Sequence, residues 1–200
     1  MASKDRILRL KEETRTNILD AALQIVKEEG WQALSMRKIA DVIEYTAPII
    51  YEYFSNKEAI LLELNRKGFL ILAKDLREAK SKHRLPAKQL EAMWEAYWNF
   101  AFANKELYQG MFGVTTNCSC EMVNNLPEAD LPWDIITEVI GELMGITDME
   151  SEVICTKYYT LWSVVHGLVS INLLSRGFSD EINRQVLKDA IGGIIRTINE

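Results

Sequence analysis

The chain has 200 residues, of which 48% are hydrophobic and 26% charged, and its formal net charge is −6. This composition is ordinary for a soluble globular protein, and its 4 Pro and 10 Gly argue against long disordered linkers. No apolar run reaches the roughly 18 residues of a membrane span, and the N-terminus lacks the apolar segment of a signal peptide. With three cysteines, an odd number, the sequence predicts a reduced, cytoplasmic protein without a transmembrane helix.

The charge is divided unevenly along the chain. Residues 1–57 hold nine basic and nine acidic side chains, so the whole net charge of −6 belongs to residues 58–200. The first fifteen residues are locally basic, with five Lys or Arg against three Asp or Glu. Such asymmetry is typical of a chain whose parts have different tasks, and it weakens the objection that an acidic protein should not bind nucleic acid.

The N-terminal segment predicts two helices before a turn. Apolar residues at i, i+4, i+7 and i+8 predict a helix over residues 14–29, and they are Ile18, Ala22, Ile25 and Val26. Gly30 would end this helix, as glycines at C′ positions do. Ser35 is the expected N-cap of a second, short helix. The residues that this second helix should turn inward are Ile39, Ala40 and Val42.

A third, very short helix follows, with a proline in its first turn. Thr46 is expected to cap it, which makes Ala47 the first helical residue and Pro48 the second. Proline costs little there because first-turn N–H groups have no intrahelical partner, whereas a central strand would lose a ladder hydrogen bond. Ser55 as N-cap and Glu58 three residues later then fit a capping box that opens a long helix.

The remaining segments predict an all-α protein. Apolar residues at helical spacing predict helices at about residues 56–82, 87–103, 106–112, 132–144, 148–175 and 179–198. Residues 113–130 form one long stretch without helical pattern. We therefore predict two domains: an N-terminal three-helix unit, residues 1–57, and a helical domain, residues 58–200, joined by the long helix.

The arrangement of the three N-terminal helices is typical of a helix-turn-helix unit, whose third helix enters the major groove of DNA. Its segments read TRTNILDAALQIVKEEG, LSMRKIADV and IIYEYFSNKEAIL, with Ala21, Ala22, Gly30, Leu34, Ser35, Ile39, Ala40, Tyr51, Phe54, Lys57, Ile60 and Leu61 at matching positions. In these residues the stretch 14–61 resembles the DNA-binding domain of the TetR family of transcriptional regulators. The resemblance implies a DNA-binding role for Ser35, Arg37, Thr46, Ala47, Pro48, Ile49, Tyr51, Tyr53 and Lys57.

The implied roles follow the chemistry of the side chains. Arg37 would reach a base edge or a phosphate, and a bidentate contact with guanine is worth about 1–3 kcal/mol of discrimination. Ser35, at a helix N-terminus, would meet a phosphate. Residues 46–49 would face the floor of the groove, while the two tyrosines and the lysine would bind the DNA backbone and position the unit. Ile50 and Phe54 are expected in its small core.

The turn between the second and third helices departs from the family pattern. Glu44 stands where glycine is common, so it must adopt a positive φ or bend the turn differently. Tyr45 replaces a small aliphatic residue and must find room in the core or beside DNA.

In the second domain the segment LWSVVHGL, residues 161–168, resembles the WHG-type regulatory domain of some TetR members, which implies small-molecule binding and dimerisation. Aromatic faces on two helices fit an apolar cleft with few polar groups. The expected ligand-binding residues are Trp94, Tyr97, Trp98, Met111, Phe112, Tyr158, Trp162 and His166. Because no Arg or Lys lies on these faces, a neutral or cationic apolar ligand is favoured. A solid aromatic core is the open alternative.

The last two helices also carry small residues, which allow close helix approach. They are Thr156, Thr160, Ser163, Gly167, Ser170, Gly192 and Gly193. Two such helices from each of two chains would form a four-helix interface and a homodimer. A two-fold dimer would place its reading helices about 34–36 Å apart, or a multiple of that distance, and would bind an inverted-repeat operator.

The sequence also bears on three other classes of function. An enzyme is disfavoured because no nucleophile, acid–base or metal motif occurs, and no cofactor or metal site is predicted. Cys118 and Cys120 leave open a redox- or metal-responsive regulator, and an activator without an effector also stays open. The sequence thus favours a dimeric repressor that binds double-stranded DNA and is released by a small apolar ligand of unknown identity.

Overall fold

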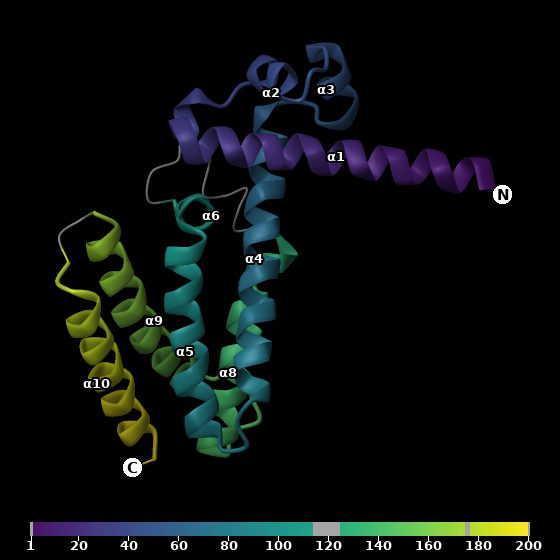
Figure 1. Ribbon diagram of the computed structural model, residues 1–200. Coiled ribbons are helices and arrows are strands. Elements are labelled where there is room, and N and C mark those ends of the chain that lie inside the picture. The colour runs from purple at the N-terminus through teal and green to yellow at the C-terminus, as the bar shows by residue number, and fades with distance from the viewer. Residues whose placement is uncertain (1, 114–124, 175–176, 200) are drawn as a thin grey trace.

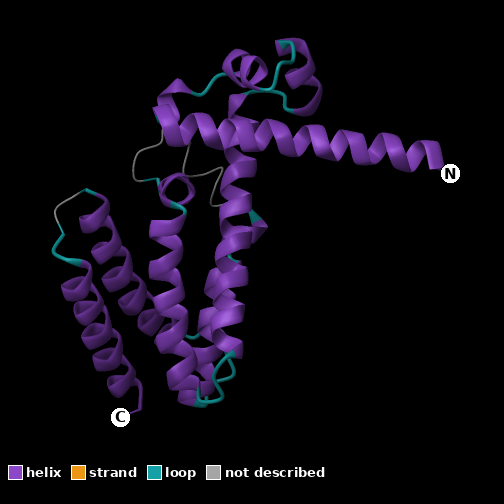
Figure 2. Ribbon diagram, in the orientation of Figure 1, coloured by secondary structure: helices purple, strands orange, loops and turns teal. Residues whose placement is uncertain are grey.

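The computed structural model describes residues 2–113, 125–174 and 177–199. Figure 1 shows an N-terminal head, a long helix that leads away from it, and further helices packed along that long helix. Within the described residues every regular element is a helix (Figure 2), which confirms the all-α prediction. The α-helices are α1 (Ala2–Glu29), α2 (Met36–Val42), α3 (Ala47–Tyr53), α4 (Lys57–Ser81), α5 (Pro86–Ala103), α6 (Lys105–Met111), α8 (Leu131–Met144), α9 (Glu152–Leu173) and α10 (Asp180–Asn199), and the 3₁₀ helices are η1 (Trp31–Ala33) and η2 (Pro127–Ala129).

The head is built from α1, α2 and α3 around a small apolar core. Ile18 of α1, Ile39 of α2 and Ile50 of α3 are fully buried, and Phe54, just after α3, is buried with them. The predicted core positions of Ile50 and Phe54 are therefore confirmed. Pro48 is the second residue of α3, also as predicted.

Two details of the head differ from the prediction. α1 begins at Ala2 and not at residue 14. Residues 4–13 are exposed, and an exposed stretch has no need of the inward apolar stripe from which the helix was predicted. Val42, expected to turn inward, is 46% exposed, because it is the last residue of α2 and lies beyond the edge of the core.

The start of α4 is capped by Asn56 and not by Ser55. The side-chain oxygen of Asn56 accepts a hydrogen bond of 2.8 Å from the backbone N–H of Ala59, and the backbone of Asn56 is extended, as at an N-cap. Serine and asparagine are both good N-caps and here they are neighbours, so the predicted capping box was placed one residue too early.

We expect Asn56→Ala to lower the free energy of unfolding by about 1 kcal/mol, because a first-turn N–H loses its acceptor. The neighbouring change Ser55→Ala should stay within about 0.5 kcal/mol of the parent, since this side chain is exposed. Urea titrations followed by circular dichroism would measure both, and a larger loss for Ser55→Ala would contradict the assignment of the cap.

Helix α4 connects the head to the C-terminal helices. It contacts α1 near the head and α5, α6 and α8 along the rest of its length. Its buried side includes Ile60 and Leu64 at one end and Leu72 and Leu76 at the other. In Figure 1, α9 and α10 lie on the far side of α5 from α4, and α10 packs on α9, α5 and α8. α4 thus contacts both the head and the C-terminal helices.

Among the described helices, none combines the length and the apolar character that a bilayer crossing requires. Apart from the early start of α1, the predicted helix boundaries agree closely with the structure, and the largest displacement among the other helices is at α9, which begins at Glu152 instead of residue 148.

Candidate functional site

The first face of interest is formed by α2, the turn after it, and α3. The hydroxyl of Ser35 accepts a hydrogen bond of 3.2 Å from the backbone N–H of Lys38, so its first task is to cap α2. The side chain of Arg37 is exposed. The ammonium of Lys38 instead pairs with Glu29 at the end of α1. Of the two cations in the first turn of α2, Arg37 is therefore the one available to a partner.

The first turn of α3 presents its side chains to the solvent. Thr46 is the N-cap residue, yet its hydroxyl makes no capping hydrogen bond, which leaves it free for a base or a phosphate. Thr46 and Pro48 are exposed, whereas Ala47 and Ile49 are half-buried. The apolar members of this turn can offer van der Waals contact with a thymine methyl but no side-chain hydrogen bond.

The residues expected to bind the DNA backbone are not equally available. Tyr51 is 54% exposed, while Tyr53 is half-buried. The ammonium of Lys57 donates a hydrogen bond of 3.2 Å to the backbone carbonyl of Trp31 in η1. Lys57 therefore joins the start of α4 to the connection after α1. Only the other N–H groups of its ammonium can bind a phosphate.

The turn between α2 and α3 takes the first of its two predicted conformations. Glu44 has a positive φ of 58°, in the left-handed region that glycine adopts more easily. The backbone N–H of Tyr45 donates to the carbonyl of Ala40 at 2.9 Å, and its side chain is exposed. Tyr45 has thus gone to the surface of the helix-turn-helix unit and not into its core.

The second face of interest is a polar cluster among aromatic rings between α5, α6 and α9. The Tyr97 hydroxyl accepts a hydrogen bond of 3.2 Å from Trp162 Nε1 and lies 3.3 Å from the Tyr108 hydroxyl. The Tyr108 hydroxyl and His166 Nδ1 share a hydrogen bond of 2.5 Å. Four side chains from three helices therefore form one continuous hydrogen-bonded network.

Tyr108 was not among the residues selected from the sequence. It lies in α6 one turn before Phe112, and the two rings have centroids 4.7 Å apart. That i, i+4 spacing to a selected aromatic residue was the signal that could have identified it.

The cluster holds no charge at neutral pH. Burial raises the pKa of both Tyr97 and Tyr108, so the two phenols stay protonated. Burial also lowers the pKa of His166, which keeps the imidazole neutral. A cluster with this character suits a neutral polar group, such as an ester, amide or hydroxyl, better than an ionised one.

The other expected ligand-binding residues divide into a packed group and a separate one. Trp94 is fully buried and Tyr158 nearly so, with ring centroids 6.2 Å apart. Met111 is buried against α4 beside Gly68. Phe112, Trp162 and His166 are half-buried. Trp162 and His166 belong to the hydrogen-bonded network and Phe112 lies against it, so the less buried side of the aromatic region is there, while Trp94, Met111 and Tyr158 pack as core.

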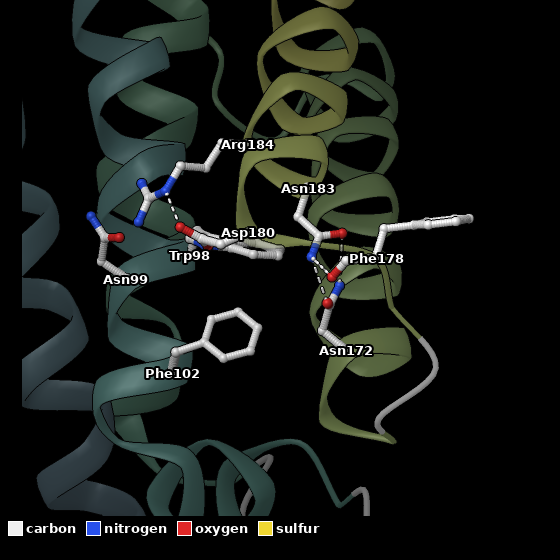
Figure 3. A pocket seen from close by; sticks show the side chains of 8 residues that line it. All are labelled: Trp98, Asn99, Phe102, Asn172, Phe178, Asp180, Asn183 and Arg184. Carbon is white, nitrogen blue, oxygen red and sulfur yellow. Dashed lines mark hydrogen bonds and ion pairs between the residues drawn. The ribbon is translucent and has the colours of Figure 1, made fainter.

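Trp98 lies elsewhere, at a hollow between α5 and the start of α10 (Figure 3). The rings of Trp98 and Phe102 are 4.6 Å apart, and the hollow has a volume of about 290 Å³. On the opposite wall Asn172 and Asn183 exchange hydrogen bonds of 2.7 and 3.3 Å. Trp98 is therefore not brought together with Tyr97 and His166.

A third face is formed by the outer sides of α9 and α10. Its exposed large apolar residues are Val153, Ile171, Leu174, Phe178, Ile182 and Val186. Between them on α9 lie Thr156, Thr160 and Ser163, which are exposed, and Gly167 and Ser170, which are half-buried. An apolar and small-residue surface of this kind is typical of helices that pack against another chain.

Cys118 and Cys120 lie outside the described residues. Cys155, in α9, is half-buried. Within the described ranges, no group of three or more His, Cys, Asp or Glu side chains is arranged to hold a metal ion.

Two family descriptions match the chain. Residues 18–64 match the description "Bacterial regulatory proteins, tetR family", and residues 90–189 match "Tetracyclin repressor-like, C-terminal domain". The chain is 26% identical over 190 residues to the HTH-type transcriptional activator FasR of Mycolicibacterium smegmatis, covering 93% of this chain and 81% of that protein.

Two solved structures have the same fold over most of the chain. FadR of Bacillus subtilis in complex with stearoyl-CoA has a TM-score of 0.71 at 17% identity, covering 89% of this chain and 98% of the other. FadR of Thermus thermophilus in complex with lauroyl-CoA has a TM-score of 0.62 at 20% identity, covering 92% of each chain. At such identities the likeness concerns the fold alone.

Proposed function

Because the chain belongs to the TetR family of bacterial transcriptional regulators, we propose that it represses transcription by binding an inverted-repeat operator as a dimer, and that a small apolar ligand releases it. The observation that carries this proposal is the exposed first turn of α3 beside the free cation of α2. Thr46, Pro48 and Arg37 are there exposed together on the head, as a helix that reads base edges requires.

The reading head would comprise residues 1–57 and the regulatory domain residues 58–200. In this division Arg37 contacts a base edge or a phosphate, Ser35 and the exposed Tyr51 bind the backbone, and residues 46–49 meet the groove floor. Tyr53 and Lys57 are half-buried, so their contribution would be to position the head on the backbone, with Lys57 also holding the connection after α1.

The effector is proposed to bind on the open side of the hydrogen-bonded network around Tyr97 and His166. The neutral character of this network supports a ligand with an uncharged polar group among apolar surroundings. Two structural neighbours are complexes with stearoyl-CoA and lauroyl-CoA, which supports a ligand that carries an apolar chain. An ionised head group would lie outside the network, since no Lys or Arg among the described residues is hydrogen-bonded to its four side chains.

The dimer is proposed to form through the outer faces of α9 and α10. The six exposed apolar residues of this surface would be costly to leave in water. A second copy related by two-fold symmetry would bury them in a self-complementary interface and orient the two heads toward successive turns of DNA.

An activator is the second candidate function. It is favoured by one finding, the likeness to FasR, which is described as a transcriptional activator. A reporter gene placed behind the chain's own operator would distinguish the two, since deletion of the regulator raises expression for a repressor and lowers it for an activator.

Selection of bound sites from random duplexes tests the proposal directly, and we expect an inverted repeat to be recovered. On that site Arg37→Ala should cost about 1–3 kcal/mol and relax the preference at one base pair in each half. Tyr51→Phe removes one hydroxyl and should weaken binding to all sequences alike, because a phosphate contact carries no sequence information. Fluorescence anisotropy on a panel of single-base variants would measure both. A specificity unchanged by Arg37→Ala with weaker binding would assign Arg37 to a phosphate. Recovery of no repeat, or an affinity and a specificity both unchanged by Arg37→Ala, would refute the proposed reading surface.

A further inference from the structure

The first turns of α1 extend from the head as an exposed arm. In Figure 1, α1 passes below α2 and α3, and its N-terminal part continues beyond α3. Residues 4–13 are exposed throughout. The polar contacts of these side chains stay within the helix: Arg9 pairs with Glu13 at 3.8 Å, and Thr14 donates to the carbonyl of Leu10. A helical segment of this length gains little from its own hydrogen bonds in water, so it is a candidate for contact with a partner.

One face of this arm continues the buried face of α1. Lys4, Lys11 and Arg15 are spaced by seven and four residues and therefore lie on one side of the helix. Arg15 pairs with Glu63 of α4 at 3.0 Å and lies over the ring of Phe54, 5.1 Å from its centroid. Because Phe54 directly follows α3, the side of α1 that carries the two lysines looks toward the end of the reading helix.

The opposite side of the arm carries a second pair of cations. With about 100° between successive residues, Arg6 and Arg9 lie roughly 140–160° around the helix from Lys4 and Lys11. Arg9 is already paired with Glu13. Two exposed apolar residues, Ile7 and Leu8, flank the lysines on the side that looks toward α3. The arm thus has one face with the two lysines and with Ile7 and Leu8, and an opposite face with the two arginines and Glu13.

We propose that this arm lies along the DNA backbone beside each half-site, with Lys4 and Lys11 bound to phosphates outside the base pairs that α3 reads. The inference rests on the proposed operator binding. Seven residues of α-helix span about 10 Å, which exceeds the roughly 3.4 Å of duplex axis per phosphate on one strand. The two lysines can therefore reach two different phosphates while Ile7 and Leu8 cover the sugars between them.

Charge favours DNA over a second copy of the chain as the occupant of this face. Residues 2–11 contain four Lys or Arg and one acidic residue. Two such arms repel each other, whereas a duplex, with one negative charge per roughly 1.7 Å, attracts them. The whole chain has a net charge of −6, and four basic less one acidic residue give residues 2–11 a charge of +3, so the rest of the chain carries −9. Contacts with flanking DNA are therefore expected from this locally basic segment.

The test compares two double variants of the full chain that remove the same charge from opposite sides of the arm. Lys4→Gln with Lys11→Gln should weaken binding at least about tenfold on an operator with roughly one extra helical turn of DNA at each end. The slope of log K against log salt should flatten by about 3.6, which corresponds to four phosphates per dimer at 0.9 each. Arg6→Gln with Arg9→Gln should change affinity less than about twofold. On an operator trimmed to the repeat, the lysine pair should lose most of its effect.

Three results would overturn the inference. Equal effects of the two double variants would mean a general electrostatic contribution and no oriented contact. An altered sedimentation coefficient in the lysine variant with unchanged DNA affinity would make a second copy the occupant of this face. A lysine effect that persists on the trimmed operator would place the contact inside the half-site. If only the arm proposal is wrong, the parent protein still binds the operator and Arg37→Ala still weakens that binding. If the parent protein does not bind the operator, the operator proposal itself is wrong.

Discussion

Replacement of Ile171 by arginine should turn the dimer into a monomer and abolish operator binding while each protomer stays folded. Ile171 lies on the outer face of α9 and is 49% exposed in the single chain, so an arginine side chain at this position can extend into solvent without disturbing the core. In a two-fold interface the same guanidinium would be buried twice without a partner, at a cost of about 3–5 kcal/mol. Since 1.4 kcal/mol is a factor of ten, association should weaken by more than about 100-fold.

The matched control is Leu70→Arg on α4. Leu70 is also an exposed apolar residue, at 39%, but Figure 1 shows α4 on the other side of α5 from α9 and α10. Sedimentation velocity should find the control dimeric and the Ile171 variant monomeric, and circular dichroism should find both helical. An Ile171→Arg protein that remains dimeric, or a Leu70→Arg protein that becomes monomeric, would refute the interface on α9 and α10.

The parts of the fold that the sequence predicted well are those with a strong local signal. Gly30 ends the first helix, Ser35 caps the second, and Pro48 limits where the third can begin, and each acts through its own backbone. The early start of α1 was missed for a physical reason. Its first turns are exposed, and sequence periodicity reports a buried face and not the helix itself.

The candidate effector site could be predicted only in part, because it depends on contacts between distant helices. Trp94 and Trp98 are one turn apart on α5, so periodicity assigns them to one broad face. In the structure Trp94 packs near Tyr158 of α9, while Trp98 lines the hollow beside α10. Which neighbour covers each ring is decided by how α9 and α10 dock on α5, and no local pattern carries that information.

Gly110 of α6 lies where the head meets the C-terminal helices. A Cβ atom at Gly110 of α6 would lie 2.5 Å from the side-chain oxygen of Asn65 in α4 and 3.1 Å from the indole ring of Trp31. Asn65 is almost fully buried, and its side-chain oxygen has no hydrogen-bond partner among the residues that the structure describes. α6 also carries Tyr108, whose hydroxyl is hydrogen-bonded to His166. A single short helix therefore connects the polar cluster to the connection after α1.

We expect Gly110→Ala to weaken operator binding by about tenfold, although it alters no residue of the reading surface. The added methyl must push apart α6, α4 and the connection after α1, and overpacking of this kind costs about 1–3 kcal/mol. Gly68→Ala is the matched control, because its Cβ would meet the Sδ and Cγ atoms of Met111, a flexible side chain that can move aside. It should therefore leave operator affinity nearly unchanged.

Anisotropy titrations on the selected operator would measure both glycine variants, with thermal unfolding run in parallel. The contact of α6 with α4 and η1 controls DNA affinity only if Gly110→Ala binds the operator more weakly at a temperature where the variant is fully folded. Equal behaviour of the two variants would instead show that close packing on α4 matters for stability alone. If Gly110→Ala binds as tightly as the parent, the head tolerates displacement of α6, and a signal from the polar cluster must then reach the head along α4 itself.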